Sequence, residues 1–387
     1  MSPFDLIVVG AGPAGTMAAR EAAGRGARVA LVDGSHPREK ACGGGVTGRA
    51  LDLVGELPGN AGSDASGHAI DAAVFEARGR SVRVGVTGGD VLRVYSRAAL
   101  DAALLRRAIA AGAVHVAARA TRVARDGVRW AVDIGGTEPL RAPWLLGADG
   151  PGGITRRQVF RPFSRAQLSI AAGSFVDGVS VSDIAIAFTN DPPGYFWSFP
   201  RRDHLAAGTC AQADISGPQP LHAFTDAWLD RYAPAAGRPR RRYAWPIPSL
   251  RANDLEEERP AGRGWMLLGD AAGLVDPITR EGIYFALRSG QLAAAALASR
   301  DPASTYAEGV RDELHAELRR AARLKAAFFR PHFTGLLLDA LEQSAAIRAV
   351  MIDLIGGRQP YAGLKRRLLG TLEFGLMWKL VASHTTL

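Results

Sequence analysis

The feature that most constrains this chain is a glycine pattern near its amino-terminal end. Residues 4–9 are mostly apolar, as in a strand that is buried on both faces. Gly10, Gly12 and Gly15 follow with the spacing G-x-G-x-x-G. Gly10 permits a tight turn, Gly12 lets the backbone approach a pyrophosphate, and Gly15 lets a helix pack close to the strand. The pattern therefore predicts a strand, a turn and a helix that together bind a dinucleotide.

The residues around the glycines favour the same interpretation. Pro13 and Ala14 complete the sequence GAGPAG and begin the predicted helix, whose free N–H groups and positive dipole end suit phosphates. A second strand is predicted over residues 28–33 and ends at Asp33, whose carboxylate suits the hydroxyls of an adenosine ribose. This is the full context that the dinucleotide fingerprint requires. A glycine-rich turn without a ligand is the alternative, and the pattern alone does not separate NAD from FAD.

Three later segments place charged residues at similar structural positions. Ser96 is a candidate helix N-cap, and Arg97 lies in the first turn, where a nearby pyrophosphate or solvation explains a cation. Two further apolar strands run into Asp149-Gly150 and into Asp270. Open α/β sheets bind ligands outside the carboxyl ends of their strands, so both aspartates are candidate ligand contacts. The alternative is that they only cap helices or turns.

Together these segments resemble the FAD-dependent oxidoreductase superfamily with the p-hydroxybenzoate hydroxylase-like fold. GAGPAG with Asp33 resembles its ADP-binding fingerprint, GADG resembles its DG motif, and residues 269–283 resemble its GD motif. The resemblance implies that the bound dinucleotide is FAD rather than NAD. It implies that Arg97 lies near the pyrophosphate and Asp270 near the ribityl chain. Gly282 and Ile283 would lie against the isoalloxazine. Arg280 is a departure, because the family often has glycine there; its side chain would crowd the flavin or contact an anion or substrate.

The segment REKACGGGVTGRAL, residues 38–51, resembles the geranylgeranyl reductase branch of this superfamily. The resemblance implies that Lys40, Cys42, Gly43 and Gly44 contact the flavin, because bare backbone can lie flat against its ring. Cys42 is then the candidate catalytic residue, as a proton donor beside the ring, with a bound water as the alternative. A small buried cysteine and a flexible glycine loop are the structural alternatives.

Tyr195, Trp197 and Phe199 alternate along a predicted strand, which places the three aromatic rings on one face. The pattern P-x-x-Y-x-W-x-F-P, which begins at Pro192, also resembles geranylgeranyl reductases. The resemblance implies a substrate-binding role for the three rings, whereas packing in a hydrophobic core is the alternative. We also expect neighbouring strands near residues 167–178, 182–191 and 204–213, which together form an antiparallel sheet.

These patterns predict an α/β fold: a Rossmann-like FAD-binding domain with a parallel sheet, an inserted antiparallel substrate-binding sheet and a helical C-terminal segment. The expected boundaries are residues 1–154 for the first part of the FAD domain, 155–262 for the substrate domain, 263–300 for the return to the FAD domain and 301–387 for the helical domain. A leucine stripe from Leu364 to Leu380 with flanking basic residues predicts a helix there. That helix is either docked on the protein or in contact with an anionic membrane surface.

The resemblance implies an oxidoreductase that reduces double bonds of a geranylgeranyl-type polyprenyl chain by hydride transfer from reduced flavin. The substrate is then an isoprenoid or another hydrophobic small molecule. A flavin-dependent monooxygenase or halogenase is the alternative, and a flavoprotein limited to electron transfer is a third. No second dinucleotide pattern is visible, so NADPH, reduced ferredoxin and a quinol stay open as electron donors.

Composition narrows the remaining classes of function. The net charge of +9 comes mainly from arginine, with no dense basic block that interleaves aromatics, which argues against nucleic-acid binding. The 2 cysteines form no C-x-x-C pair, which argues against a disulfide framework or a metal site and fits a reducing compartment. We expect a cytoplasmic protein, with peripheral membrane contact an open possibility. The sequence does not indicate an oligomeric state.

Overall fold

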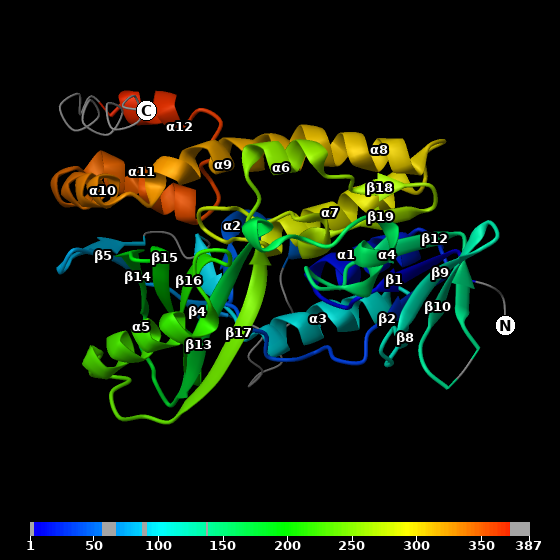
Figure 1. Cartoon of the computed structure of the whole chain (residues 1–387), viewed down its shortest axis with the longest axis horizontal. Helices are drawn as coiled ribbons and strands as arrows, with labels where there is room; N and C mark the ends of the chain where they lie inside the picture. Colours follow the sequence, from blue (N-terminus) through cyan, green and yellow to red (C-terminus); the bar gives the residue numbers. More distant parts are fainter. Residues whose placement is uncertain (1–3, 56–66, 87–90, 137, 372–387) are drawn as a thin grey trace.

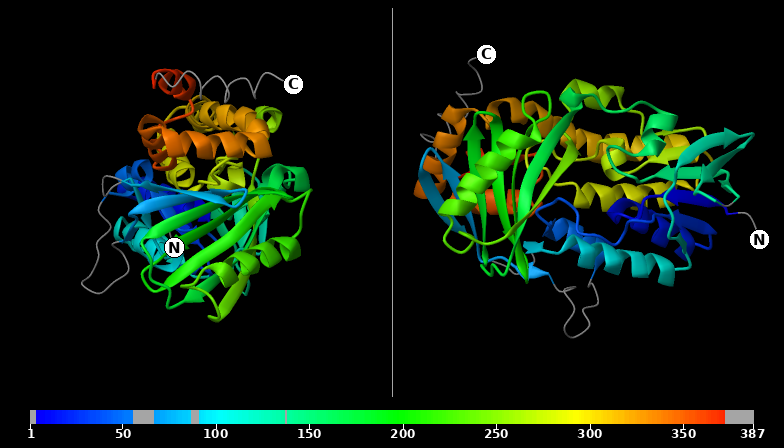
Figure 2. Two further views of the ribbon diagram at one scale, coloured as in Figure 1. Left: turned by 90° about the vertical axis from the view of Figure 1, so that its left-hand side faces the viewer. Right: turned by 60° about the horizontal axis from the view of Figure 1, so that its bottom comes forward.

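The computed structural model describes residues 4–55, 67–86, 91–136 and 138–371 (Figure 1). A parallel sheet and a larger, mostly antiparallel sheet lie side by side, and the helices that follow residue 300 run along one edge of both (Figures 1 and 2). The fold class is the α/β arrangement expected from the sequence.

The first sheet is assembled from segments that are far apart in the chain. Its strand order is β18 (Ala261–Gly262), β19 (Trp265–Leu267), β12 (Trp144–Gly147), β1 (Leu6–Val9), β2 (Val29–Val32) and β8 (Val114–Val116). All neighbouring strands are parallel except β18 and β19. The carboxyl ends of β1, β12 and β19 therefore meet at one edge, where the glycine turn and the two candidate aspartates follow.

This parallel sheet is covered on both faces, which explains why its strands are continuously apolar. Leu6, Val8 and Leu31 pack on the helical side, and Ile7 and Val9 pack on the opposite side. The surrounding elements are α1 (Pro13–Gly24), α3 (Arg97–Ala110), α4 (Ile154–Val159) and α7 (Ile283–Ala296), with a small antiparallel sheet of β9 (Arg122–Asp126), β10 (Arg129–Asp133) and β11 (Leu140–Ala142). Helix α1 packs against α3 and α7.

The second sheet has the order β17 (Arg240–Pro248), β13 (Leu168–Asp177), β16 (His204–Gln212), β15 (Pro193–Pro200), β14 (Asp183–Asn190), β5 (Ala72–Ala77) and β6 (Arg80–Gly85). The four strands predicted between residues 167 and 213 are confirmed. One face packs on α5 (Pro218–Arg231), where Phe196 stacks on Trp228 with ring centroids 4.3 Å apart. The other face carries Tyr195 and Trp197.

Two strands of this sheet come from outside the range in which we expected it. Strands β5 and β6 lie within residues 1–154, yet β5 pairs with β14 in parallel. Burial of Ala73 and Phe75 beneath α10 (Pro331–Gln343) explains why this hairpin belongs with the second sheet. The segment between the first glycine motif and α3 therefore crosses from one sheet to the other and returns.

The connection between the sheets contains β3 (Gly45–Thr47), α2 (Gly48–Val54), β4 (His68–Ala69) and β7 (Leu92–Val94), with β7 between β3 and β4. Short helices η2 (Arg165–Gln167), α6 (Ala252–Glu257) and η3 (Gly269–Ala272) join larger elements. The C-terminal region comprises α8 (Pro302–Gly309), η4 (Val310–His315), α9 (Ala316–Phe328), α10, α11 (Ala345–Ile355) and α12 (Leu364–Leu369).

Only the first part of the predicted leucine-striped helix lies within the described residues. Helix α12 contains Leu364 and Leu368, whereas Leu372, Leu376 and Leu380 lie outside the described residues. Within the described ranges, no helix is both long enough and apolar enough to cross a membrane.

Candidate functional site

A large cavity lies where the two sheets and the C-terminal helices meet, and its water-accessible volume is about 240 Å³. Thirteen residues that the sequence singled out line it: Pro13, Lys40, Cys42, Gly43, Gly44, Arg97, Tyr195, Trp197, Phe199, Asp270, Arg280, Gly282 and Ile283. They come from segments as far apart as the first glycine turn and the start of α7. The fold therefore brings most of the candidate cofactor and substrate residues to one place.

The glycine turn between β1 and α1 has room on the side where a dinucleotide is expected. Gly10 has a φ of +105°, and a Cβ there would lie 2.3 Å from the carbonyl oxygen of Ala148. A Cβ on Gly15 would lie 1.9 Å from the carbonyl oxygen of Gly10. By contrast, a Cβ on Gly12 would meet only the Nε2 atom of His36, at 3.8 Å. Backbone contacts thus require two of the glycines, while the open side of Gly12 fits an approaching pyrophosphate.

Asp33 lies at the end of β2 and faces this turn. One carboxylate oxygen accepts a hydrogen bond from the Ala11 backbone N–H at 2.8 Å and contacts His36 Nδ1 at 2.7 Å. Burial alone would raise the pKa of Asp33, but the bonds from His36 and Ala11 lower it well below its usual range. Asp33 is therefore ionised, as an acceptor for ribose hydroxyls must be. The sequence did not single out His36, which also reaches Asp101 Oδ2 at 3.5 Å.

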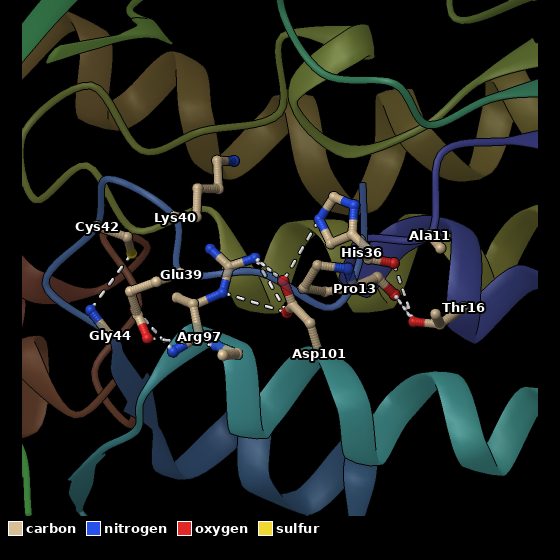
Figure 3. Close-up of polar contacts among 12 residues, drawn as sticks. Ala11, Pro13, Thr16, His36, Glu39, Lys40, Cys42, Gly44, Arg97 and Asp101 are labelled. Atoms are coloured by element: carbon tan, nitrogen blue, oxygen red, sulfur yellow. Dashed lines mark hydrogen bonds and ion pairs between the residues drawn. The ribbon is translucent and has the colours of Figure 1, made fainter. Parts of the chain in front are cut away.

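Arg97 begins α3 as expected, and Ser96 caps the helix by accepting a bond from Ala99 N–H. Figure 3 shows the Arg97 guanidinium directed at Asp101, one turn along the same helix. The two side chains are buried and their closest atoms are 2.9 Å apart. Asp101 therefore neutralises the charge of Arg97. Arg97 also lines the cavity.

Asp149 and Gly150 do not line the cavity. Asp149 Oδ2 accepts hydrogen bonds from the Thr155 backbone N–H at 2.9 Å and from its hydroxyl at 3.0 Å, so Asp149 holds the start of α4. Burial raises the pKa of Asp149 against the opposing effect of these bonds. The geometry matches the capping alternative that the sequence left open.

Asp270 follows β19 and lines the cavity. Its carboxylate pairs with Lys40 Nζ at 3.2 Å, which links the GD segment to the bend at residues 40–45. A Cβ on Gly282 would lie 3.3 Å from Asp270 Oδ1, and Ile283 begins α7 just beyond. Asp270 and Lys40 therefore form a charged pair in the cavity wall, next to the start of α7.

The bend at Cys42 to Gly45 packs against the aromatic strand. Cβ atoms on Gly43 and Gly45 would lie 3.0 and 3.1 Å from the Phe199 ring. Gly44 has a φ of +83°, and a Cβ there would lie 2.2 Å from the Tyr95 carbonyl oxygen. The Gly44 N–H donates to Cys42 Sγ at 3.3 Å (Figure 3). Each glycine is therefore required by a contact, and the thiol is held at the cavity wall.

An ion pair that the sequence did not reveal, between a buried arginine and a partly buried glutamate, fixes this bend. Arg201 follows β15, donates to the Cys42 carbonyl oxygen at 2.7 Å and pairs with Glu39. Glu39 also accepts from the Ser96 hydroxyl at 2.7 Å and from the Arg97 backbone N–H at 3.1 Å. Burial alone would raise the pKa of Glu39, but Arg201 and these donors lower it. The pair thus connects the aromatic strand, the bend and α3.

The aromatic face of β15 forms the wall opposite the cofactor segments. The Tyr195 hydroxyl donates to the Thr279 carbonyl oxygen at 2.8 Å, and its ring stacks on Phe329 with an interplanar angle of 5°. Burial raises the pKa of Tyr195 well above its usual value, so the hydroxyl stays protonated. The cavity lining also contains the apolar side chains of Phe188, Phe328, Met351, Leu354 and Ile355.

Arg280, the departure noted in the sequence, adopts a left-handed backbone conformation with a φ of +60°. Its side chain points towards the second sheet, where Nε lies 3.5 Å from Cys210 Sγ and Nη1 lies 2.9 Å from Ser249 Oγ. The guanidinium therefore contacts the sheet that carries the aromatic strand. Within the described ranges, no group of three or more His, Cys, Asp or Glu side chains could hold a metal ion.

A family model and two known reductases match this chain over most of its length. A family model described as "FAD binding domain" matches residues 4–300. A menaquinone reductase of Mycobacterium tuberculosis is 30% identical over 392 residues, which cover 91% of this chain and 90% of the relative. A digeranylgeranylglycerophospholipid reductase of Methanothrix thermoacetophila is 30% identical over 355 residues, with 84% and 88% covered.

Solved structures share the fold. A geranylgeranyl bacteriochlorophyll reductase-like protein of Thermoplasma acidophilum superimposes with a TM-score of 0.77 at 21% identity, covering 95% of this chain and 99% of the other. A flavin-dependent brominase gives a TM-score of 0.74 at 21% identity, with the same coverage. Because both reductases and halogenases adopt this architecture, the fold alone does not select the reaction.

Proposed function

The chain belongs to the family of FAD-binding oxidoreductases that includes the geranylgeranyl reductases, and we propose that it reduces carbon–carbon double bonds of a polyprenyl chain. The observation that carries the proposal is the cavity itself. It joins the bend at Cys42 to Gly45, the aromatic face of β15 and apolar side chains of α9 and α11. A long, unsaturated hydrocarbon fits such a space better than a small polar substrate does. The names of the relatives, which include reductases of digeranylgeranyl lipids, support the same class.

We assign the cofactor contacts from the positions described above. Gly12 and the start of α1 take the pyrophosphate, and Asp33 takes the ribose. Asp270 and Lys40 take the ribityl region, and Gly282 and Ile283 take the ring. These assignments are supported by the open side of Gly12 and by the shared cavity wall. When bound, reduced FAD supplies the hydride that an unpolarised alkene needs at one carbon.

The chain's own residues supply the remaining chemistry. Tyr195, Trp197 and Phe199 exclude water and stabilise developing positive charge on the alkene through their ring faces. We assign the proton for the second carbon to the Cys42 thiol, which lines the cavity and is oriented by the Gly44 N–H. One hydride and one proton then add across the double bond, and the thiolate regains its proton from water.

Incubation of the FAD-loaded protein with dithionite and prenyl compounds under anaerobic conditions tests the proposal. Geranylgeraniol, geranylgeranyl diphosphate and menaquinone serve as substrates. Mass spectrometry follows the products after air has reoxidised the menaquinol ring that dithionite itself forms, so that only saturated double bonds retain added hydrogen. A gain of two hydrogens for each reduced double bond is expected with at least one substrate. The absence of a mass gain with all three would overturn the proposed function.

The monooxygenase or halogenase alternative makes a different prediction. A halogenase needs a free lysine near the flavin, but Lys40 is paired with Asp270 and its ammonium lies 5.9 Å from the centre of the Trp245 ring. Oxygen-dependent NADPH consumption that an aromatic substrate accelerates would favour that alternative. Under the proposed function, aromatic compounds leave the rate of NADPH consumption unchanged.

A further inference from the structure

Two basic side chains at one corner of the cavity share a single hydroxyl group. The Ser249 hydroxyl lies 2.9 Å from Arg280 Nη1 and 2.7 Å from Lys325 Nζ. Lys325 also donates to Gln212 Oε1 at 2.7 Å. Arg280 additionally contacts Cys210 Sγ and the Pro277 carbonyl oxygen. Two cations are thus held close together, and all of these partners are neutral.

Among the described residues, the fully buried arginines are neutralised by carboxylates. Arg97 pairs with Asp101, Arg156 with Glu258 and Arg201 with Glu39. Within the part of the chain that the structure describes, no carboxylate lies within ion-pair distance of Arg280 or Lys325. The nearby Asp214 is 3.8 Å from Arg251 instead. A like-charge pair without a counterion is costly unless a ligand supplies the missing charge.

The backbone conformation of Arg280 and the burial of Lys325 also indicate a site for an anion. Arg280 holds a left-handed conformation that favours glycine, and such strain is concentrated at ligand sites. Burial, together with the charge of Arg280, lowers the pKa of Lys325 to about 7. Arg251 lowers this pKa further, while Cys210 and Asp214 act in the opposite direction. An anion bound beside the pair would restore the full charge of Lys325.

The position of the pair indicates the kind of anion. Arg280 lines the cavity beside Tyr195 and Trp245, whereas Lys325 stands behind it at Ser249. The far part of the same cavity is apolar. A ligand that satisfies both regions has an anionic end and a long hydrocarbon chain. The planar guanidinium, with added charge behind it, suits the several oxygens of a phosphate.

We infer that Arg280, supported by Lys325, forms a subsite for the phosphate-bearing end of a prenyl substrate. The inference rests on the proposed function for the prenyl part, but the anion subsite stands on its own contacts. Arg280 contacts the phosphate, and Lys325 is a positioning residue that acts through Ser249 and through its charge. The prenyl chain then runs from this corner, past Tyr195 and Trp197, towards α11.

Ligand affinities of the FAD-loaded protein test the inference. The ligands are geranylgeranyl diphosphate, digeranylgeranylglyceryl phosphate and uncharged geranylgeraniol, and quenching of tryptophan fluorescence reports each Kd. The wild-type protein should bind at least one phosphate about tenfold or more tightly than the alcohol. The two phosphate arms distinguish a free diphosphate from a lipid headgroup. Equal affinity for the alcohol and both phosphates would overturn the inference.

Three variants test which side chains cause the preference for a phosphate over the alcohol. Arg280→Gly, which restores the glycine common in the family, should bring the ratio of alcohol to phosphate Kd close to one. Lys325→Gln should reduce the ratio in part, and the loss should shrink above pH 8, where wild-type Lys325 is already neutral in the free protein. Arg141→Gln removes an exposed arginine on β11, which is not among the groups that shift the pKa of Lys325, as a control and should leave the ratio unchanged. An equal loss for alcohol and phosphate, or a loss of FAD affinity alone, would contradict the assignment.

Failure of the anion subsite and failure of the proposed function are distinguishable. If wild-type protein reduces geranylgeraniol but shows no preference for a phosphate, the function stands and the subsite is wrong. If it prefers the phosphates in an Arg280-dependent manner but reduces none of the prenyl compounds, the subsite stands and the reductase proposal is wrong.

Discussion

At the scale of single residues, the site depends on a few side chains whose charge or hydrogen-bonding state is unusual. Cys42 lies at the cavity wall with its sulfur bonded to Gly44 N–H. Lys325 lies beside Arg280 and has a pKa of about 7, lowered by burial and by that neighbour. Each residue leads to a prediction that a single substitution tests.

Replacement of Cys42 by alanine tests the assigned proton donor. We expect Cys42→Ala to lower the rate of prenyl reduction by about 100-fold or more, as loss of a general acid does. The Kd for FAD should change less than about twofold, because the bend is held by Arg201 and Glu39 rather than by the thiol. Cys210→Ala, which removes the other cysteine, should lower the rate far less. An unimpaired Cys42→Ala enzyme would assign the proton to water instead.

Replacement of Lys325 by methionine tests the lowered pKa through protein stability. The pKa rises from about 7 in the folded protein to about 10.5 in the unfolded chain, so the unfolded state binds more protons between these values. Wild-type stability therefore rises with pH across that window, and the cost of the buried charge is largest below pH 7. Lys325→Met should gain about 2 kcal/mol over wild type at pH 6 and nothing near pH 10. Denaturant unfolding at both pH values measures this, and a difference independent of pH would contradict it.

At the scale of elements, the bend between residues 42 and 45 and the strand β15 act as one unit. Phe199 fills the space left by Gly43 and Gly45, and Arg201 ties the end of the strand to the Cys42 carbonyl oxygen. The bend is therefore shaped by the second sheet, although it follows the first sheet in the chain.

Alanine substitution at two glycines with positive φ separates packing from backbone strain. Gly44 and Gly135 have φ values of +83° and +79°, but only a Cβ on Gly44 meets other atoms, at 2.2 Å from Tyr95 O. Gly135→Ala should cost about 1 kcal/mol from backbone strain alone. Gly44→Ala should cost about 2 kcal/mol more, because the bend must move. Denaturant unfolding measures the two costs, and equal losses would show that the contact with Tyr95 is unimportant.

The sequence predicted those elements whose signals are local. The glycine spacing gave β1, α1 and β2, and alternating aromatics gave β15, because each signal lies within one segment. The entry of β5 and β6 into the second sheet was not predictable, since it depends on pairing with β14 about 100 positions away. The link from Arg201 to Glu39 spans 162 positions and left no pattern in the sequence. Arg280 was visible as a departure, but only the fold shows where its side chain points.

At the scale of the whole molecule, the cavity joins the FAD-binding part, the second sheet and the C-terminal helices. A cofactor bound there contacts segments from all three parts. Bound FAD should therefore stabilise the protein as a whole.

Thermal unfolding with different flavins measures that stabilisation. FAD at 100 times its Kd should stabilise the folded protein by about 2.7 kcal/mol and raise the Tm by roughly 3 °C. FMN, which lacks the adenosine and one phosphate, should raise it much less because it cannot reach Gly12 and Asp33. Equal stabilisation by FMN and FAD would contradict the assignment of these residues.

The most direct test of the central claim is a crystal structure of the FAD-loaded protein with geranylgeranyl diphosphate. We predict that the isoalloxazine lies between the bend at Cys42 to Gly45 and the start of α7. A double bond of the prenyl chain should lie between the ring and the aromatic face of β15. Density that places the ring away from the bend, or the prenyl chain outside the cavity, would contradict the claim.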